Sequence, residues 1–338
     1  RLADEIEEHF DKLVEAESKD NGKPEWLARA VDIPRASENF RFFATASLHF
    51  DSEIHEMDGK ALNYTLRQPV GVAGCISPWN LPLYLLTWKI APALAAGNTV
   101  VAKPSEITPM TAFLLSKICQ KANFPKGVLN IVHGYGHKVG DALSRHPDVP
   151  IISFTGGTAT GEKIASAAAP MFKKLSLEMG GKNPNIVFED ADFDKSVDMA
   201  VKAAFSNQGQ ICLCGSRLFV QESIYEKFRG NFTRKTKELK VGSPKEDDNN
   251  LGAIVSKTHM EKVLSCIELA KLEGGTILTG GKRIILEGEL SEGFYIEPTV
   301  IDGLNYTCQT NQEEIFGPVV SMIPFSTEKE VIDMANST

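Results

Sequence analysis

The chain has 338 residues, of which 42% are hydrophobic and 24% charged. This is the composition of a globular protein, and the length favours two domains over one. Lys and Arg number 36 against 44 Asp and Glu, and the formal net charge of −8 disfavours a nucleic-acid-binding surface, so a small molecule is the favoured partner.

The cysteine pattern and the lack of long apolar runs predict the compartment. The six cysteines are scattered along a large chain, unlike the dense disulfide frameworks of small secreted domains. Cys212 and Cys214 form C-x-C rather than the paired C-x-x-C of zinc sites, and no histidines cluster near them, so no metal is expected. No apolar run reaches the roughly 20 residues that span a bilayer, and residues 1–5 lack a signal-peptide core. We expect a soluble, cytoplasmic protein without a membrane partner.

The two ends of the sequence predict a fragment. The chain starts at Arg1 rather than at Met, and it ends at Thr338 after an amphipathic segment without a stop signal. We therefore expect that both ends lie inside a longer protein.

The first half of the chain has the rhythm of repeated βα units. Residues 1–50 have helical spacing of apolar residues, and residues 61–67 alternate apolar with polar, which predicts a half-buried strand or an arm that pairs with another subunit. From Val70 onward short apolar runs alternate with helical stretches, which is typical of a parallel sheet covered by helices. The predicted strands are 70–76, 99–103, 128–132, 150–154 and 174–178, and the predicted helices are 82–95, 109–121, 138–143 and 161–168.

A second α/β rhythm begins after Gly180 and Gly181. The pattern there predicts strands at 185–188 and 217–221, helices at 193–205, 224–239 and 256–272, and loops at 241–250 and 286–294. The predicted boundaries are a first domain of residues 1–49 and 69–179, an arm of residues 50–68, and a second domain of residues 180–338.

The segment 205–217, FSNQGQICLCGSR, sets Cys212 in a small polar turn between two apolar segments. Glu178 lies 34 positions earlier, where a predicted strand ends before two glycines. A thiol and a carboxylate on turns indicate covalent acyl chemistry, provided that the fold lowers the thiol pKa from about 8.5. For an isolated cysteine the ordinary alternative, a small buried residue, is favoured.

Asn80 is polar among apolar neighbours in the segment 76–82, ISPWNLP, at the end of the first strand of the βα series. Open α/β sheets place ligands at this end of their strands. The Asn80 amide can donate a hydrogen bond to an oxyanion that forms when a thiolate attacks a carbonyl, a contribution of roughly 2.7 to 4 kcal/mol in comparable sites. By itself the motif would favour a helix N-cap.

Lys103 and Glu106 follow the next strand in the segment VAKPSE. Both side chains can hydrogen-bond ribose hydroxyls, and the carboxylate favours NAD because it repels a 2′-phosphate. In isolation this segment is an ordinary turn with solvated charges.

Two further turns indicate a function only when they are considered together with the other segments. Residues 154–161, FTGGTATG, form G-x-x-x-x-G at a strand-to-helix turn, where backbone N–H groups can face a pyrophosphate. They lack both the Lys-Ser/Thr of a nucleoside-triphosphate loop and the spacing of G-x-G-x-x-G. Residues 313–318, EEIFGP, join a carboxylate and an aromatic ring to a Gly-Pro pair that can fix a tight loop; the alternative is an exposed acidic turn.

Together, and in this order, these segments resemble the NAD(P)-dependent aldehyde dehydrogenase superfamily over nearly the whole chain. The resemblance implies an α/β fold with a Rossmann-like NAD-binding domain, a second α/β catalytic domain and a β-arm for oligomerisation into homodimers or homotetramers. It implies that Cys212 is the nucleophile, two residues after a glutamine, with Glu178 as general base and Asn80 as oxyanion donor. It also implies NAD contacts from Ile76, Pro78, Trp79, Lys103, Glu106, Gly156, Gly157, Gly161, Glu314 and Phe316.

The sequence also departs from the family pattern. Gly157 stands where relatives often carry serine, which weakens side-chain contact with the phosphates and makes the cofactor preference less sharp; Glu106 still favours NAD. The later Pro-Phe-Gly-Gly segment, the C-terminal β-arm and the N-terminal strand region of the family are absent from this sequence.

A branch within the family is suggested by residues 210–214, 80–89 and 39–44, which look like the 2-aminomuconic and 2-hydroxymuconic semialdehyde dehydrogenases. Their substrates carry a carboxylate, so a cation should face the substrate. The resemblance assigns this task to Arg35, with a surface salt bridge as the alternative. A broad-specificity or retinal-type aldehyde dehydrogenase and a non-catalytic protein on the same fold remain open as rival hypotheses.

Overall fold

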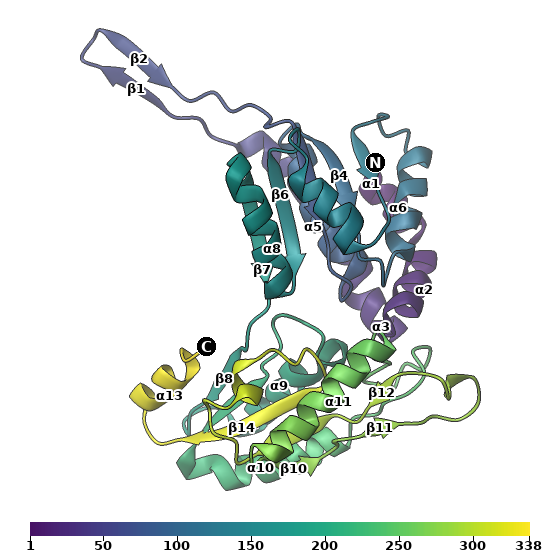
Figure 1. Cartoon of the computed structure of the whole chain (residues 1–338), viewed down its shortest axis with the longest axis vertical. Helices are drawn as coiled ribbons and strands as arrows, with labels where there is room; N and C mark the ends of the chain where they lie inside the picture. Colours follow the sequence, from purple (N-terminus) through teal and green to yellow (C-terminus); the bar gives the residue numbers. More distant parts are fainter. The chain divides into compact units, whose positions relative to one another are not determined.

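The computed structural model describes residues 1–338, and the chain forms two compact units (Figure 1). The first consists of Arg1–Glu17 and Arg29–Met179, and the second of Ser18–Ala28 and Gly180–Thr338. The segment 18–28 thus belongs to the second unit, although the predicted boundaries gave residues 1–49 to the first domain. Local periodicity shows that a segment is amphipathic but not which core covers it. Here Trp26 Nε1 donates to the Asn249 carbonyl at 2.7 Å and fastens the segment to the second unit.

The first unit is built on a five-stranded parallel sheet with the strand order β5-β4-β3-β6-β7. In chain order this is the doubly wound arrangement, in which the order reverses at the central strand. The predicted Rossmann-like α/β fold is confirmed. The strands are β3 (Val72–Ile76), β4 (Thr99–Lys103), β5 (Leu129–Ile131), β6 (Ile151–Gly156) and β7 (Lys174–Met179), and the helices are α1 (Leu2–Glu8), α4 (Ile33–Ala46), α5 (Pro82–Ala95), α6 (Met110–Lys121), α7 (Asp141–Arg145) and α8 (Thr158–Ala168). Helix α2 (Phe10–Asn21) begins in this unit and ends in the other.

The sheet register brings the predicted motifs of this unit to one edge. Ile76, the last residue of β3, is paired with Lys103 of β4 on one side and with Phe154 of β6 on the other. The ends of β3, β4 and β6 therefore lie together at the point where the strand order reverses, which is where open α/β sheets bind ligands.

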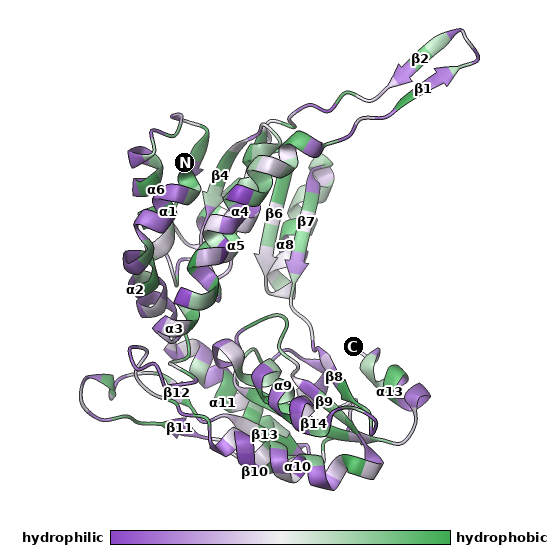
Figure 2. Ribbon diagram, turned by 180° about the vertical axis from the view of Figure 1, so that it is seen from behind, coloured by the Kyte–Doolittle hydropathy of each residue, from purple (hydrophilic) through white to green (hydrophobic).

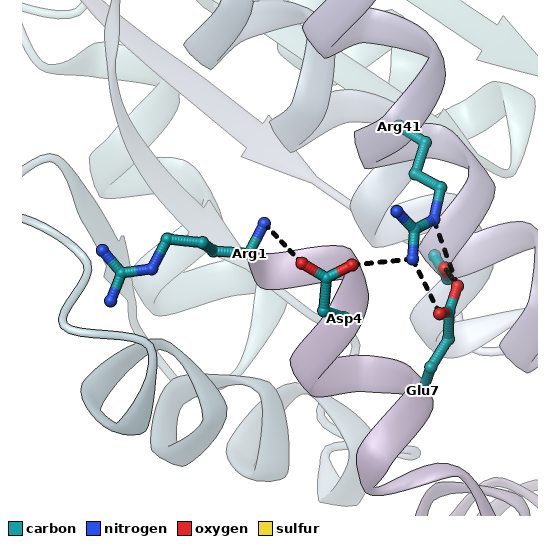
Figure 3. A network of polar contacts seen from close by, with 5 residues as sticks. Arg1, Asp4, Glu7 and Arg41 are labelled. Carbon is teal, nitrogen blue, oxygen red and sulfur yellow. Dashed lines mark hydrogen bonds and ion pairs between the residues drawn. The ribbon is translucent and has the colours of Figure 1, made fainter.

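A charged cluster fixes α1 to α4, the helix that carries Arg35 (Figure 3). The guanidinium of Arg41 contacts Asp4 Oδ1 at 2.8 Å and Glu7 Oε2 at 2.7 Å. Ser37 Oγ donates to Glu7 Oε1 at 2.5 Å, and the hydrogen bond from Arg41 is the main reason that the pKa of Glu7 is lowered. The three charged side chains are exposed, so their value is to fix the helix orientation more than to add stability.

The predicted arm is a two-stranded antiparallel hairpin of β1 (Ile54–Met57) and β2 (Ala61–Tyr64). The predicted strand is present, but it is exposed on both faces rather than half-buried: Leu62 and Tyr64 are 65% and 60% exposed. An alternating pattern indicates a face suited to burial, and no part of this chain covers that face.

The second unit has its own five-stranded sheet, in the order β10-β13-β14-β9-β8. All neighbouring pairs are parallel except β10 with β13. The prediction named β8 and β9 but missed the strands after residue 272, whose short apolar runs lie among glycines and charges. The strands are β8 (Pro184–Val187), β9 (Arg217–Gln221), β10 (Thr276–Thr279), β13 (Thr299–Asp302), β14 (Val319–Phe325) and the pair β11 (Arg283–Ile284) and β12 (Tyr295–Ile296), and the helices are α3 (Glu25–Leu27), α9 (Phe193–Phe205), α10 (Glu222–Lys237), α11 (Lys257–Leu272), α12 (Gln309–Gln312) and α13 (Glu328–Ala335).

Each sheet is the apolar centre of its unit. Figure 2 shows hydrophobic colour along β6 and hydrophilic colour spread over α10. In the second unit, Leu218 and Val220 of β9 pack with Phe228 and Phe232 of α10 in one core cluster. No helix combines the length and the apolar character needed to cross a membrane.

Candidate active site

The turn between β3 and α5 holds Asn80 in a buried, polar setting. Asn80 is 3% exposed, and the peptide before it is fixed because Thr108 Oγ1 donates to the Trp79 carbonyl at 3.2 Å. Ser77 N–H donates to the Lys103 carbonyl at 3.1 Å, which ties this turn to the end of β4. The turn that carries Asn80 is thus rigid and polar, as a hydrogen-bond donor to a developing negative charge requires.

The first turn of α5 is capped by a residue that the sequence did not indicate. Both carboxylate oxygens of Glu17 accept from Leu83 N–H, at 3.3 and 3.4 Å, and Glu17 is fully buried. A carboxylate at a helix N-terminus satisfies a free donor and opposes the positive end of the helix dipole. Glu17 therefore supports α5, which begins two residues after Asn80.

Lys103 and Glu106 are brought together at the end of β4. Lys103 Nζ contacts Glu106 Oε2 at 2.6 Å, and Gly136 N–H donates to Glu106 Oε1 at 3.0 Å. Burial alone would raise the pKa of Glu106, but the bonds from Lys103 and Gly136 outweigh it and lower the pKa. The Glu106 carboxylate is therefore ionised near neutral pH and held in one orientation.

The N-terminus of α8 offers backbone donors to an anion. Gly157 is the N-cap, no side chain caps the helix, and a side-chain carbon at Gly157 would meet nothing within 4 Å. Beside it lies a cavity of about 350 Å³. Its lining comes from the end of β3, from residues 136–144 and from α8: Ile76, Gly136, His137, Gly140, Asp141, Ser144, Thr160, Lys163, Ile164 and Ala167. A free helix N-terminus next to a mostly apolar hollow and a fixed carboxylate fits a dinucleotide.

Glu178 lies in β7, next to the last residue of the strand, and is exposed. Lys89 of α5 is a neighbour that the sequence did not reveal: it is 4% exposed, and its Nζ donates to Ser153 Oγ at 3.4 Å. Burial lowers the pKa of Lys89 to about 8, while the nearby Cys75 and Glu178 act in the opposite direction. A buried lysine with a lowered pKa thus lies within electrostatic reach of Glu178.

Arg35 lies on α4 and faces Tyr84 of α5. Its guanidinium carbon is 5.4 Å from the centre of the Tyr84 ring, and Nη2 donates to the Tyr84 hydroxyl at 3.4 Å. Nη1 also pairs with Glu38 at 3.1 Å, and the side chain is 44% exposed. Arg35 is oriented by Tyr84, four residues after Asn80, and keeps an accessible charge.

The residues before Cys212 form a strained turn in the second unit. Asn207, Gln208 and Gly209 are consecutive residues with φ of 51°, 57° and 69°. Each non-glycine residue in this left-handed region costs roughly 1–2 kcal/mol, and such strain persists only where the surroundings enforce it. Gln208 Nε2 donates to the Ala253 carbonyl at 2.9 Å, and Gln210 Oε1 accepts from Val255 N–H at 3.2 Å. Side chains of the turn itself therefore hold it in place.

The two cysteines of C-x-C lie in different environments. Cys212 is half-buried, whereas Cys214 is 7% exposed and its Sγ faces the Ser206 carbonyl at 3.9 Å. Burial raises the pKa of Cys214 to about 12, so its thiol stays protonated and unreactive. Of the two, only Cys212 has the exposure that a nucleophile needs.

The loop that carries Glu314 and Phe316 is fastened by α11. Lys262 Nζ donates to the carbonyls of Glu314 and Ile315 at 2.9 and 3.2 Å, and a ring nitrogen of His259 lies 2.7 Å from the Phe316 carbonyl. Phe316 has φ of 60°, a further strained position. The Glu314 carboxylate accepts from Gly181 N–H at 3.4 Å, and burial raises its pKa.

The sequence-predicted residues thus fall into two groups. Arg35, Asn80, Glu178 and the residues of the Ile76, Lys103 and Gly156 motifs belong to the first unit, and Cys212, Glu314 and Phe316 belong to the second. The supporting residues Glu17, Lys89, His259 and Lys262 were missed because no local motif marks a side chain whose partner is distant in sequence.

The model of the aldehyde dehydrogenase family matches residues 1–338. The chain belongs to the aldehyde dehydrogenase family. It is 52% identical, over 340 aligned residues, to the human 2-aminomuconic semialdehyde dehydrogenase, and the match covers all of this chain and 70% of that protein. It is 46% identical to the 2-hydroxymuconic semialdehyde dehydrogenase of Pseudomonas sp. strain CF600, with the same coverage. The solved NAD⁺ complex of an aldehyde dehydrogenase from Bacillus cereus superposes with a TM-score of 0.96 at 41% identity, covering 100% of this chain and 68% of that one.

These similarities confirm the family that the motifs indicated. The protein is an NAD-dependent aldehyde dehydrogenase, an oxidoreductase that acts on aldehydes. The 2-aminomuconic semialdehyde dehydrogenases are among its relatives, as the three branch segments predicted. The chain spans about 70% of the length of the curated relatives that it matches.

Proposed function

We propose that the protein oxidises a carboxylated semialdehyde, 2-aminomuconate semialdehyde or a close analogue, to the acid through a thioester on Cys212. The observation that carries the proposal is the contrast within C-x-C. Cys212 is half-buried at the end of a rigid turn, whereas the neighbouring thiol of Cys214 has a pKa of about 12. Of the two thiols, we therefore assign the nucleophile to the more exposed one, that of Cys212.

The chemistry divides into two steps. The Cys212 thiolate attacks the aldehyde carbon, and the Asn80 amide with the Cys212 N–H donates to the resulting oxyanion. NAD, when bound, accepts hydride from the hemithioacetal carbon, which leaves a thioester on Cys212. Glu178 then takes a proton from water, the hydroxide adds to the thioester carbonyl, and the carbon–sulfur bond breaks to release the acid and free Cys212.

The cofactor contacts that we propose lie along the edge of the first sheet and in residues 314–318, the EIFGP loop that carries Glu314 and Phe316. Lys103 and Glu106 bind the adenosine ribose, and Trp79 and Pro78 lie near the cofactor. The uncapped turn from Gly156 to Gly161 faces the pyrophosphate, with the cavity beside α8 taking the adenine. Glu314 and Phe316 hold the nicotinamide ribose.

Substitution of Cys212 tests the mechanism. In the full-length protein, Cys212→Ala should abolish NADH formation from an aldehyde, and Cys214→Ala should retain most of it. Thermal unfolding of both variants controls for folding. Turnover that survives in Cys212→Ala would overturn the assignment of the nucleophile.

Arg35 is proposed to bind the substrate carboxylate. Arg35→Ala should raise KM for aldehydes that carry a carboxylate and leave KM for neutral aldehydes of similar length unchanged, because only the former lose an ion pair. Arg29→Ala is a matched control, since Arg29 is a half-exposed arginine of the same unit that pairs with Asp11. An equal effect on both aldehyde classes would favour a broad-specificity or retinal-type enzyme.

The compartment and the assembly are further proposals. Six free cysteines support a reducing compartment, the cytoplasm. The apolar side chains exposed on the β1–β2 hairpin, among them Ile54, Leu62 and Tyr64, support assembly into a homodimer or homotetramer through this arm. Light scattering on the full-length protein, with Leu62 and Tyr64 replaced by Ser, should report smaller particles if the arm holds the subunits together.

A further inference from the structure

The conformation of Cys212 depends on the two peptide groups that flank it. The peptide before Cys212 is fixed by the Ile211 carbonyl, which accepts from Cys214 N–H at 3.0 Å. The peptide after it is fixed by the Cys212 carbonyl, which accepts from Nδ2 of Asn183. Rotation about φ moves one of these planes relative to the Cα atom, and rotation about ψ moves the other. With both carbonyls held, the direction of the Cys212 N–H and of its Cα–Cβ bond is set.

The Asn183 amide contacts both cysteines of the turn. Besides the Cys212 carbonyl, Nδ2 donates to the Cys214 carbonyl at 3.1 Å, so both amide hydrogens are used. The far side of the turn is packed, because a side-chain carbon at Gly215 would lie 2.9 Å from Cβ of Asn185. Asn183 is the side chain from outside the turn that hydrogen-bonds to the backbone on both sides of Leu213.

Asn183 is itself held by Arg217, the first residue of β9. Arg217 N–H donates to the Asn183 carbonyl at 3.1 Å, which continues the β8–β9 pairing, and Nε donates to the Lys182 carbonyl at 2.8 Å. Arg217 is fully buried, and its remaining nitrogens reach the carbonyls of Met334 and Ala335 at the end of α13. The support of the cysteine turn therefore runs back to β9 of the second unit's sheet and to the end of α13.

We infer that Asn183 is a positioning residue that aligns the Cys212 thiolate and the Cys212 N–H for attack on the aldehyde and for binding of the oxyanion. The inference deepens the proposed function and rests on it. Asn183 touches neither substrate nor cofactor in this role; it acts through the backbone carbonyls of Cys212 and Cys214. The amide is required as a donor, since a group that only accepts hydrogen bonds would repel both carbonyls.

Asn183→Asp tests this requirement with almost no change of shape. In the full-length protein, kcat should fall by between about tenfold and about a hundredfold, because small misplacements of reacting groups and loss of an oxyanion donor have effects of this size. KM for NAD should change by less than about twofold. Asn231→Asp introduces the same charge in the same unit, on α10, where the Asn231 amide donates only to the Lys227 carbonyl of that helix; it is the matched control and should retain kcat. Asn183→Ser, which keeps one donor, should lie between the wild type and Asn183→Asp.

Two readouts separate this inference from the proposed function. Hydrogen–deuterium exchange should be faster across residues 211–215 in Asn183→Asp than in Asn231→Asp, and this measurement needs no aldehyde turnover. The pH profile of Cys212 alkylation by iodoacetamide should change in Asn183→Asp but not in the control. If the two Asp variants share the same kcat, exchange and alkylation profile, the inference is wrong, even where Cys212→Ala confirms the nucleophile. If Asn183→Asp unfolds at assay temperature, Asn183→Ser decides by the same measurements.

Discussion

The sheet edge of the first unit and the cysteine turn of the second use their polar groups differently. At the edge of β3, β4 and β6, the N-terminus of α8 is uncapped, and a hollow of about 350 Å³ lies beside it. In the cysteine turn, residues 207–215, polar side chains instead hold the backbone. Gln208 and Gln210 bond to the backbone of residues 253 and 255, and Asn183, from outside the turn, bonds to the Cys212 carbonyl. A ligand site needs donors that stay available, whereas a covalent nucleophile needs one fixed geometry. The first region should therefore tolerate added atoms, and the second should not.

The largest expected effect is that of Gly209→Ala in the cysteine turn. The added carbon would overlap the Gly317 carbonyl and lie 2.9 Å from Pro318 N, at a residue with φ of 69°. Overpacking and left-handed strain together should lower the free energy of unfolding by at least about 3 kcal/mol, measured by urea denaturation. Gly274→Ala, at φ of 93° with nothing within 4 Å, should cost about 1 kcal/mol from strain alone. Equal losses of unfolding free energy in Gly209→Ala and Gly274→Ala would contradict the tight packing of the cysteine turn.

Glu106→Gln tests the fixed carboxylate of the sheet edge. The amide removes the charge that opposes a 2′-phosphate, so the preference for NAD over NADP should fall by about tenfold. Steady-state kinetics with both cofactors measure this ratio. Glu162→Gln, an exposed acidic residue of α8, controls for the change in net charge. An unchanged preference for NAD over NADP would contradict the proposed contact of Glu106 with the cofactor.

Each unit also contains a buried lysine whose pKa falls to about 8, and these two lysines should respond alike to pH. Burial lowers the pKa of both Lys89 and Lys182 to about 8. Above pH 8 the unfolded state still binds a proton that the folded state has released, so the free energy of unfolding should rise from pH 8 to pH 9, by about 1 kcal/mol per lysine. The gain stops at higher pH, since thiols such as Cys75, with a pKa raised to about 12 by burial, ionise more readily once unfolded. Lys89→Met and Lys182→Met should each reduce the rise of the free energy of unfolding between pH 8 and pH 9, measured by urea denaturation. An unchanged rise would contradict the lowered pKa of that lysine.

The smallest effect is expected for Gly157→Ser at the edge of the first sheet. Gly157 has open space around its Cα and a φ of −70°, so a side chain fits without strain. The free energy of unfolding should change by less than about 0.5 kcal/mol, and KM for NAD should stay equal or fall, because the hydroxyl can donate to a phosphate. A loss of stability as large as that of Gly209→Ala would contradict the looser packing that we infer for the sheet edge relative to the cysteine turn.

Much of the fold followed from local pattern. Helix 193–205 and strand 217–221 were predicted with the bounds that the structure has, because both have strong apolar periodicity and clear turn signals. The strands after residue 272 were missed because they are short and lie among glycines and charges. The segment 18–28 was given to the wrong unit, since its partner Asn249 lies more than 200 residues away.

The candidate site, like the fold, could be predicted from the sequence only in part. Cys212, Glu178 and Asn80 were proposed from motifs, and their catalytic roles remain predictions. The family resemblance chose Cys212 over Cys214, but their difference in burial could not come from the sequence, because only Leu213 separates them and their local context is the same. Only the packing of Cys214 beneath the turn separates the two thiols.

The sequence by itself determined the βα rhythm, the order of the motifs and the family, because these depend on residue type and spacing. Tertiary structure alone decided which residues support the chemistry: Glu17 at the start of α5, Lys89 near Glu178, His259 and Lys262 on the EIFGP loop, and Asn183 on the cysteine turn. The physical reason is that a hydrogen bond or a desolvated charge depends on distance in space, and sheet register and helix packing bring together residues that the chain keeps far apart.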